Sequence, residues 1–187
     1  MKHKLAMVDL DNTLVFTMEA NALAYRRALA EYGFALSKED YASRCDGRAY
    51  RDFLPEIMGA DSPFIEAVHE RKIALYGECL TAAEPNRPLL DILRAIKPDY
   101  ILALVTTASR RNVEAVLERF ELTALFDLVV TQEDVRRAKP DPACYNDLIE
   151  RLGVDRADCV IFEDSASGVQ AALASGCQTL VVKRGAV

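Results

Sequence analysis

Short apolar runs alternate with helical stripes along the second half of the sequence, and this alternation strongly constrains the fold. The runs occupy residues 100–105, 126–130, 159–162 and 179–182, and apolar residues at helical spacing precede each of them. Apart from Asp127 and Thr179, the runs are apolar at successive residues rather than at every second residue, which is typical of strands covered on both faces. The pattern predicts an α/β fold with a doubly wound (Rossmann-like) parallel sheet.

A fifth apolar run, Leu5–Val8, opens the chain and ends abruptly at two carboxylates. If the strand period continues past its end, Asp9 and Asp11 point to the same side. Two carboxylates aimed at one small volume repel each other unless they share a cation or a proton. Ordinary turn chemistry at Asp11-Asn12 is the alternative explanation of this pair.

The stretch between this first run and a proline-rich connector near residue 85 has only helical patterns. Helical stripes or helix-like segments are found at residues 25–32, 50–57 and 64–79. Pro55 lies inside the second stripe and is expected to kink that helix or to mark its boundary. We therefore predict an all-helical cap domain, residues 15–85, inserted into a core formed by residues 1–14 and 86–187.

Composition limits the classes of partner. The formal net charge of -6 argues against nucleic acid or an anionic membrane surface as the main partner. No apolar run approaches the roughly 20 residues of a membrane span, and the first run is too short for a signal peptide. Five scattered cysteines without a CxxC motif favour reduced, structural thiols. We therefore expect a cytoplasmic protein.

The residues that follow the predicted strands are chemically related. In open parallel sheets, ligands bind beyond the carboxyl ends of the strands, so these residues are expected to converge on one crevice. Carboxylate oxygens are the ligands that Mg²⁺ prefers, and a nearby lysine suits an anionic phosphoryl group. An aspartate can act as a covalent nucleophile, and a second carboxylate can act as general acid and base. The residues concerned are Asp9, Asp11, Thr106, Lys139, Glu163 and Asp164.

Each of these residues also has a simpler explanation when it is taken alone. Thr106 is compatible with an ordinary turn at a strand end, and Lys139 with a solvated surface lysine. Glu163 and Asp164 could form an N-cap cluster for the helix that begins near Ser165. Their joint occurrence, in this order and at successive strand ends, favours shared chemistry.

Four motifs in order carry a resemblance to a known family: DLDNT from Asp9, LVTTAS around Thr106, KPDP from Lys139, and FEDSASG around Asp164. The sequence resembles the haloacid dehalogenase-like superfamily of aspartate-nucleophile hydrolases over essentially its whole length. The resemblance implies that Asp9 is the nucleophile and Asp11 the acid/base. It also implies that Thr106 and Lys139 bind the phosphoryl oxygens, with Lys139 restraining Asp9.

The same resemblance implies a Mg²⁺ site. The ion would be held by the Asp9 carboxylate, the main-chain carbonyl of Asp11 and the Asp164 carboxylate. Glu163 would either ligate the ion or support the residues that do.

The helical insert resembles the small cap of the beta-phosphoglucomutase and phosphoglycolate phosphatase branch. Dehalogenases lack a carboxylate equivalent to Asp11, so its presence disfavours that activity. Beta-phosphoglucomutases typically carry a histidine where this chain has Asn21, which weakens the mutase interpretation without removing it.

Four further positions complete the predicted substrate pocket together with Asn21. The loop beginning at Gly47 resembles the specificity loop of this branch, and Arg48 and Arg51 are candidates to contact a polar or anionic leaving group. Solvated helix positions are the alternative for both arginines. Thr107 is expected to shape the phosphate pocket.

We therefore predict a Mg²⁺-dependent phosphatase that hydrolyses a small soluble phosphomonoester through an aspartyl phosphate. The chain is expected to be a monomer or weak dimer, with no nucleic-acid or membrane partner. Two alternatives remain: a sugar-phosphate mutase that uses the same core residues, and a non-catalytic binding protein on the same scaffold.

Overall fold

The computed structural model describes residues 2–184 and divides the chain into two compact units. The core unit is Met1–Phe16 with Pro85–Val187, and the cap unit is Thr17–Glu84. Two very short strands, β2 (Val15–Phe16) and β3 (Glu84–Pro85), pair where the chain leaves and re-enters the core. The predicted fold class, a doubly wound α/β core with an inserted helical cap, is confirmed.

The core is built on a five-stranded sheet in which every neighbouring pair of strands is parallel, in the order β5-β4-β1-β6-β7. β1 is the central strand, and Val8 at its carboxyl end lies opposite Leu104 of β4 and Phe162 of β6. The carboxyl ends of three adjacent strands therefore lie side by side. The strands are β1 (Lys4–Val8), β4 (Tyr100–Val105), β5 (Leu128–Val130), β6 (Cys159–Glu163) and β7 (Gln178–Val181).

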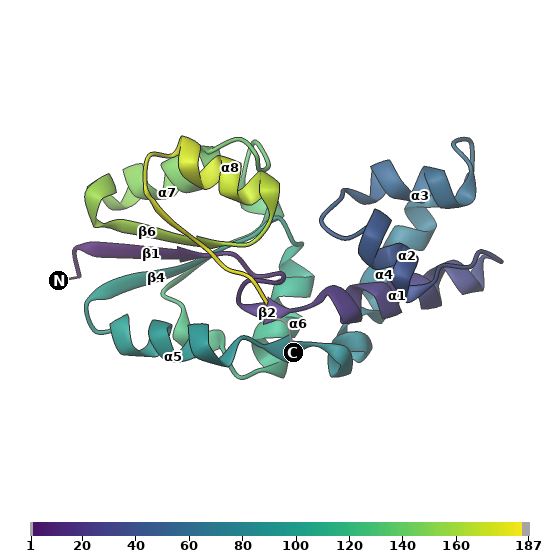
Figure 1. Ribbon diagram of the computed structural model, residues 1–187, viewed down its shortest axis with the longest axis horizontal. Helices are drawn as coiled ribbons and strands as arrows, with labels where there is room; N and C mark the ends of the chain where they lie inside the picture. The colour runs from purple at the N-terminus through teal and green to yellow at the C-terminus, as the bar shows by residue number, and fades with distance from the viewer. Residues whose placement is uncertain (1, 185–187) are drawn as a thin grey trace. The chain divides into compact units, whose positions relative to one another are not determined.

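Helices cover both faces of this sheet (Figure 1), with α7 and α8 on one face and α5 and α6 on the other. Side chains alternate along β1, so Leu5 and Met7 pack with residues of α7 and α8 while Ala6 and Val8 point to the opposite face. Burial on both faces explains the unbroken apolar runs of the sequence. The core helices are α5 (Arg87–Ile96), α6 (Arg110–Arg119), α7 (Ala143–Leu152) and α8 (Ala166–Ala174).

Two capped helices anchor the segments that carry the strand-end residues. The Asn86 side chain accepts a hydrogen bond from the Leu89 amide at the start of α5 and donates one to the Thr13 carbonyl in the loop after β1. The Ser165 hydroxyl accepts from the Gly168 amide at the start of α8. Such caps satisfy amides that a helix leaves free and contribute about 1 kcal/mol each.

The cap unit is a small helical domain with its own apolar core, in which α1 packs mainly against α4. The sequence left a kink or a helix boundary as the two possibilities at Pro55, and the boundary is wrong, because α3 continues through the proline. The Gly59 amide donates to the Pro55 carbonyl at 2.9 Å, and burial of Phe53, Leu54 and Met58 along one face holds α3 together through the proline. The helices are α1 (Met18–Glu31), α2 (Lys38–Arg44), α3 (Tyr50–Met58) and α4 (Ile65–Cys79).

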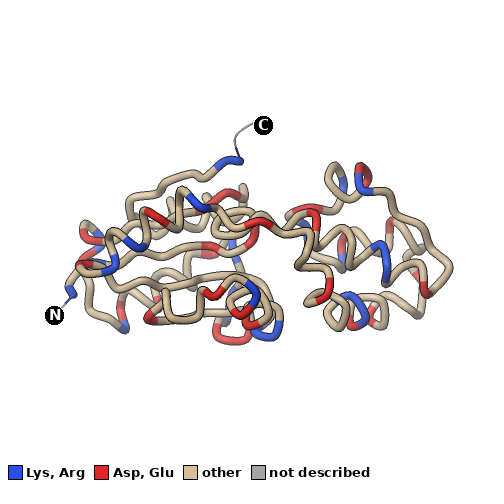
Figure 2. The backbone as a smooth tube through the Cα atoms, turned by 90° about the horizontal axis from the view of Figure 1, so that it is seen from below, with Lys and Arg blue, Asp and Glu red and all other residues tan. Residues whose placement is uncertain are grey.

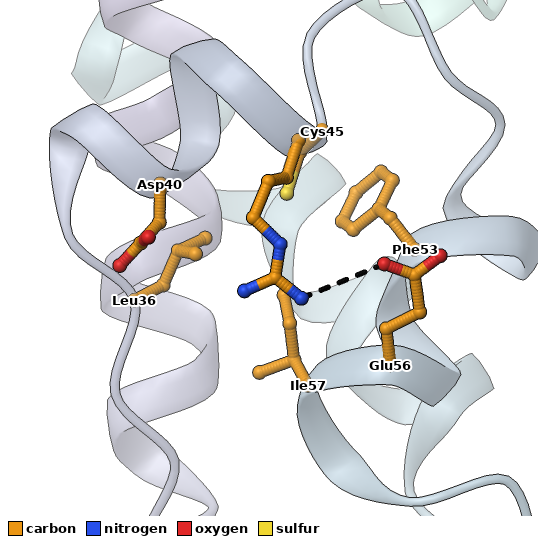
Figure 3. Close-up of a pocket in the computed structure, with 7 residues that line it drawn as sticks. Leu36, Asp40, Cys45, Phe53, Glu56 and Ile57 are labelled. Atoms are coloured by element: carbon orange, nitrogen blue, oxygen red, sulfur yellow. Dashed lines mark ion pairs between the residues drawn. The ribbon is translucent and has the colours of Figure 1, made fainter.

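A small pocket lies between α2 and α3 of the cap unit (Figure 3), and its volume is about 10 Å³. The Arg44 guanidinium faces Glu56 across it at 3.6 Å. A cavity of this size has room for about one water molecule, so it is too small for a metabolite. Its lining residues are Leu36, Asp40, Arg44, Cys45, Phe53, Glu56 and Ile57.

A half-buried histidine lies among aromatic and cationic side chains in the cap unit. The His69 ring stacks on Tyr50 with 3.6 Å between centroids, and its Nδ1 is 3.0 Å from the Tyr25 hydroxyl. The pKa of His69 is lowered to about 4, mainly by burial and in addition by the neighbouring Lys72 ammonium. The unfolded chain therefore binds a proton at this residue at a higher pH than the folded cap.

This difference predicts a pH-dependent stability of the cap unit. Between about pH 6.5 and pH 4 the unfolded state carries the extra proton, so acidification in that window is expected to lower the free energy of unfolding. Thermal unfolding of the native chain and of His69→Gln, followed from pH 7.5 to pH 4.5, checks this. The native melting temperature should fall more steeply than that of the variant, whereas His3→Gln, at an exposed position, should behave like the native chain. Parallel pH profiles for native and His69→Gln would contradict the assignment.

Charged residues of both signs are interspersed along each unit (Figure 2), which is the pattern of a mixed solvated surface rather than a basic stripe. None of the helices within residues 2–184 has both the length and the apolar character that a bilayer span requires. All five cysteines are buried and free of disulfide bonds.

Candidate active site

A tight turn directly after β1 fixes the position of Asp9. Its amide donates to the Phe162 carbonyl at 3.0 Å and so extends the pairing of β1 with β6 by one residue. Asn12 then has a φ of +61°, a left-handed conformation that asparagine tolerates better than most residues, and its amide donates to the Val15 carbonyl. The chain reverses immediately after Asp9, which leaves this residue at the carboxyl edge of the sheet.

Lys139 lies between two carboxylates at this edge. Its ammonium donates to Asp9 Oδ1 at 2.7 Å, to Glu163 Oε1 at 2.5 Å and to the Val105 carbonyl at 3.0 Å. Only 4% of its side chain is exposed. An ammonium has three N–H groups, so three protein acceptors fix its position completely. Burial opposes the charge on Lys139, but attraction to Asp9, Tyr145 and Glu163 outweighs burial and raises the lysine pKa well above its ordinary value.

Glu163 is fully buried, and hydrogen-bond donors surround its carboxylate. Oε1 accepts from Lys139 and from the Tyr145 hydroxyl at 3.0 Å. Oε2 accepts from the Asp164 amide at 3.0 Å and from the amide and hydroxyl of Ser165 at 3.4 and 3.3 Å. A carboxylate has about four acceptor positions, so these donors already use the capacity of Glu163.

Asp164 directly follows Glu163 in the chain and is only half-buried. Its Oδ1 accepts a hydrogen bond from the Thr13 hydroxyl at 2.8 Å, which links the end of β6 to the turn after β1. Burial raises the pKa of Asp164 to about 6; the bond from Thr13 lowers it, and repulsion from Glu163 raises it.

Burial strongly shifts the pKa of the Asp9 carboxyl. Burial raises its pKa to about 8, attraction to Lys139 acts in the opposite direction, and repulsion from Glu163 and Asp11 raises it again. One lysine therefore does not compensate the carboxylates gathered here. A further positive charge would favour the ionised form that a nucleophile requires.

The residues present fit a divalent cation. One carboxylate oxygen from each of Asp9, Glu163 and Asp164 lies within 4.8 Å of the other two, although Glu163 already accepts five hydrogen bonds. Burial raises the pKa of both Asp9 and Asp164, so both carboxylates would gain from a nearby cation. Hard oxygen ligands of this kind suit Mg²⁺ rather than a softer metal.

The structure places the other predicted core residues at the same edge of the sheet. Thr106 directly follows β4, is 3% exposed, and accepts a hydrogen bond from the Ala108 amide on its hydroxyl. Thr107 comes next and is exposed. Asp11 lies in the turn after β1, where it forms an isolated bridge with Val15.

The predicted substrate residues of the cap unit are found on α1 and around the turn before α3. Asn21 is half-buried on α1, and its amide group is 3.5 Å from the Thr17 hydroxyl. Gly47 has a φ of +73°, a conformation that favours glycine in this turn. The two arginines pair within the cap: Arg48 with Glu56 at 2.6 Å and Arg51 with Glu66 at 3.1 Å. Both arginines are exposed, so these pairs contribute little to stability.

Sequence reasoning missed three contributors to the core site. Tyr145 occupies an apolar stripe of α7 and could not be distinguished from a packing residue. The role of Thr13 as a donor to Asp164 depends on a contact across 151 residues. Gly168 ends the FEDSASG motif, but its structural role was not predicted: a Cβ built on it would overlap the whole carboxylate of Glu163. The sequence shows only a glycine in the first turn of the predicted helix.

The close approach at Gly168 predicts a large effect of a single methyl group. Gly168→Ala should displace Glu163, lower the free energy of unfolding by about 1–3 kcal/mol and disturb Lys139. Gly77→Ala is the matched control, because Gly77 lies inside α4 with no atom within 4 Å of a built Cβ. That variant should gain about 0.5–1 kcal/mol from helix propensity. Chemical denaturation of both variants checks the prediction, and a Gly168→Ala variant as stable as native would contradict it.

The fold and the site together define a class of protein: an α/β enzyme with an inserted helical cap and a buried lysine–carboxylate cluster at the central strand ends. Residues 6–182 match the model of the haloacid dehalogenase-like hydrolase family. The chain belongs to this family.

Three similar proteins support the assignment. A Thermotoga maritima protein named phosphorylated carbohydrates phosphatase is 36% identical over 179 residues, covering 92% of this chain and 81% of the relative. The fructose-1-phosphate phosphatase YqaB of Escherichia coli is 28% identical and covers 94% of each chain. A solved Thermotoga maritima structure, provisionally described as a beta-phosphoglucomutase, has a TM-score of 0.80 at 31% identity and covers 98% of this chain and 87% of its own. The predicted family and the predicted enzyme class, a phosphoric monoester hydrolase, are both confirmed.

Proposed function

We propose that this protein is a Mg²⁺-dependent phosphatase of a small phosphorylated carbohydrate or a similar metabolite, acting through an aspartyl phosphate. One observation carries the proposal: the Lys139 ammonium is held 2.7 Å from Asp9, in a buried cluster that also contains Asp164. The names of the relatives, which include phosphatases of phosphorylated carbohydrates and of fructose 1-phosphate, support the substrate class.

The chemistry divides between the two aspartates of the turn after β1. Asp9 attacks the phosphorus atom while Asp11 protonates the leaving oxygen. Asp11 then removes a proton from the water that hydrolyses the aspartyl phosphate. Lys139 holds Asp9 in place and neutralises negative charge as it develops, and Thr106 binds a phosphoryl oxygen. Thr107 shapes the phosphate pocket in this proposal.

Mg²⁺ would be held by the Asp9 and Asp164 carboxylates and the Asp11 main-chain carbonyl. When bound, it supplies positive charge that offsets the cost of ionising buried Asp9. We assign Glu163 to holding Lys139 in place rather than to binding the ion, because five donors already bond to its oxygens. The cap residues Asn21, Gly47, Arg48 and Arg51 are proposed to select the leaving group.

A phosphate-release assay over a panel of metabolites tests the function. The panel should include sugar phosphates, polyol phosphates, phosphoglycolate and nucleotides, with p-nitrophenyl phosphate as a general substrate. Phosphate release that depends on Asp9 supports the proposal. Isomerisation of a sugar phosphate without release of phosphate would identify the mutase instead, and no reaction with any phosphomonoester would favour a binding protein.

Removal of the metal gives a direct prediction. A chelator should reduce phosphate release to background, and added Mg²⁺ should restore it. Asp164→Asn should raise the Mg²⁺ concentration for half-maximal rate by about tenfold or more, since it removes the charge of one proposed ligand. Asp158→Asn, at an exposed position, should leave the Mg²⁺ dependence unchanged. Full activity in the presence of chelator would exclude the metal from the mechanism.

A further inference from the structure

We propose that Tyr145 is a positioning residue of the active site, whose hydroxyl fixes Glu163 and, through Glu163, the Lys139 ammonium beside Asp9. The effect on turnover rests on the proposed function. The effect on Lys139 itself does not, because it follows from the hydrogen bonds alone.

The Tyr145 side chain reaches the site from α7, and none of it is exposed. Its hydroxyl donates to Glu163 Oε1 at 3.0 Å, and its ring lies 5.4 Å from the Lys139 ammonium. Leu148 and Ile149 of the same helix pack into the same apolar cluster. A phenylalanine would fill this space equally well, so packing alone does not require the hydroxyl.

The need for the hydroxyl comes from competition between two carboxylates for one ammonium. Glu163 and Asp9 both accept from Lys139, at 2.5 and 2.7 Å, and Glu163 is the more deeply buried acid. A buried carboxylate that lacks donors draws the nearest cation more strongly. The Tyr145 hydroxyl donates a hydrogen bond to the same oxygen and so stabilises the Glu163 carboxylate. Lys139 can then remain shared between Glu163 and Asp9.

The loss of the hydroxyl should therefore shift Lys139 towards Glu163 and weaken its bond to Asp9. For Tyr145→Phe we expect kcat to fall about tenfold while KM stays within about twofold, because the change affects the reacting groups rather than the contacts with the leaving group. Tyr100→Phe is the matched control: it makes the same substitution at the amino end of β4, whereas the site lies at the carboxyl ends of the strands.

A second comparison separates positioning from general damage to the fold. If Tyr145 acts through Glu163, its replacement should matter only while the Glu163 carboxylate is present. In a Glu163→Gln background, Tyr145→Phe is therefore expected to change the remaining kcat by less than about twofold. A structural role unrelated to Glu163 predicts the same loss in both backgrounds.

The deciding measurement is the nitrogen-15 NMR signal of the Lys139 ammonium, assigned by its disappearance in Lys139→Arg. Tyr145→Phe should shift this signal and Tyr100→Phe should not, with circular dichroism used to confirm that both variants fold. An unmoved Lys139 signal in folded Tyr145→Phe overturns the proposal, even if no substrate has been found. If the native chain turns over a substrate and Tyr145→Phe has the same kcat, that result also overturns the proposal. Absence of turnover in the native chain contradicts the proposed function alone, and the NMR result still decides the role of Tyr145.

Discussion

Asp9→Asn is expected to lower kcat by about 10⁴-fold or more while the protein stays folded. The amide is nearly the same size as the carboxyl group but cannot attack phosphorus as a nucleophile. The folded state should tolerate the change, because burial and the charge of Glu163 already disfavour the ionised Asp9. When folding raises the pKa of an acid, the free energy of unfolding falls as the pH rises, because the folded state resists ionisation of that acid. An asparagine does not ionise, so Asp9→Asn does not lose stability in this way. We therefore expect the variant to be at least as stable as native at pH 8.

Rapid-quench mass spectrometry gives the matching measurement. The native chain should carry a phosphoryl group on the peptide that contains Asp9 during turnover, and Asp9→Asn should carry none. Asp99→Asn makes the same change at an exposed turn and should retain both turnover and the phosphoryl peptide. Steady-state activity of Asp9→Asn within tenfold of native would exclude the covalent mechanism.

The strands and helices of the core were predictable from the sequence because burial on both faces leaves a simple pattern. The first residue of a strand was harder to predict. The apolar run at residues 126–130 suggested a strand from Phe126, yet β5 begins at Leu128. Asp127 instead accepts a hydrogen bond from the Leu102 amide on its side chain, so a carboxylate takes the place of a backbone carbonyl beside β4. Hydrophobicity does not show such a replacement.

The composition of the core site was predictable for a topological reason, whereas the division of labour within it was not. Parallel strands bring their carboxyl ends to one edge, so Asp9, Lys139 and Asp164 could be grouped without coordinates. The assignment of Glu163 to support depends on which donors reach its two oxygens, and one of these is the hydroxyl of Tyr145. Contacts of this kind depend on side-chain orientation, which the sequence pattern does not specify.

The cap arginines show the same limit. Arg48 and Arg51 were candidate substrate contacts because they follow a turn in the predicted specificity loop. In the structure Arg48, in the turn before α3, pairs with Glu56 of α3, and Arg51 of α3 pairs with Glu66 of α4. A charge on a helix surface has several partners within reach, so spacing alone could not choose between an internal pair and a ligand.

Lys139→Met is expected to lower both the stability and the activity. Removing the ammonium leaves Asp9 and Glu163 as neighbouring buried carboxylates without a counter-charge. Breaking a buried ion pair in this way costs about 3–5 kcal/mol, and the loss of charge neutralisation should lower kcat by about 10³-fold or more. Lys2→Met is the control, because its ion pair with Asp127 is partly exposed and should contribute at most about 1 kcal/mol.

The pH dependence of the Lys139→Met variant identifies the cause of its instability. The folded-state pKa of Asp9 is already raised in the native chain, and loss of the lysine removes the attraction that lowers it. The pKa of this carboxyl should therefore rise further above its unfolded value, so stability is present at low pH and lost as the pH rises. The variant should therefore be more stable at pH 5 than at pH 8, relative to native at each pH. Lys139→Met with Glu163→Gln removes one buried charge and should recover part of the loss at pH 8. Two results together would assign the instability of Lys139→Met to lost packing rather than to unpaired charge. The double variant would be no more stable than Lys139→Met, and the stability difference between Lys139→Met and native would not vary with pH. That outcome would remove the electrostatic basis on which Lys139 is assigned to hold Asp9.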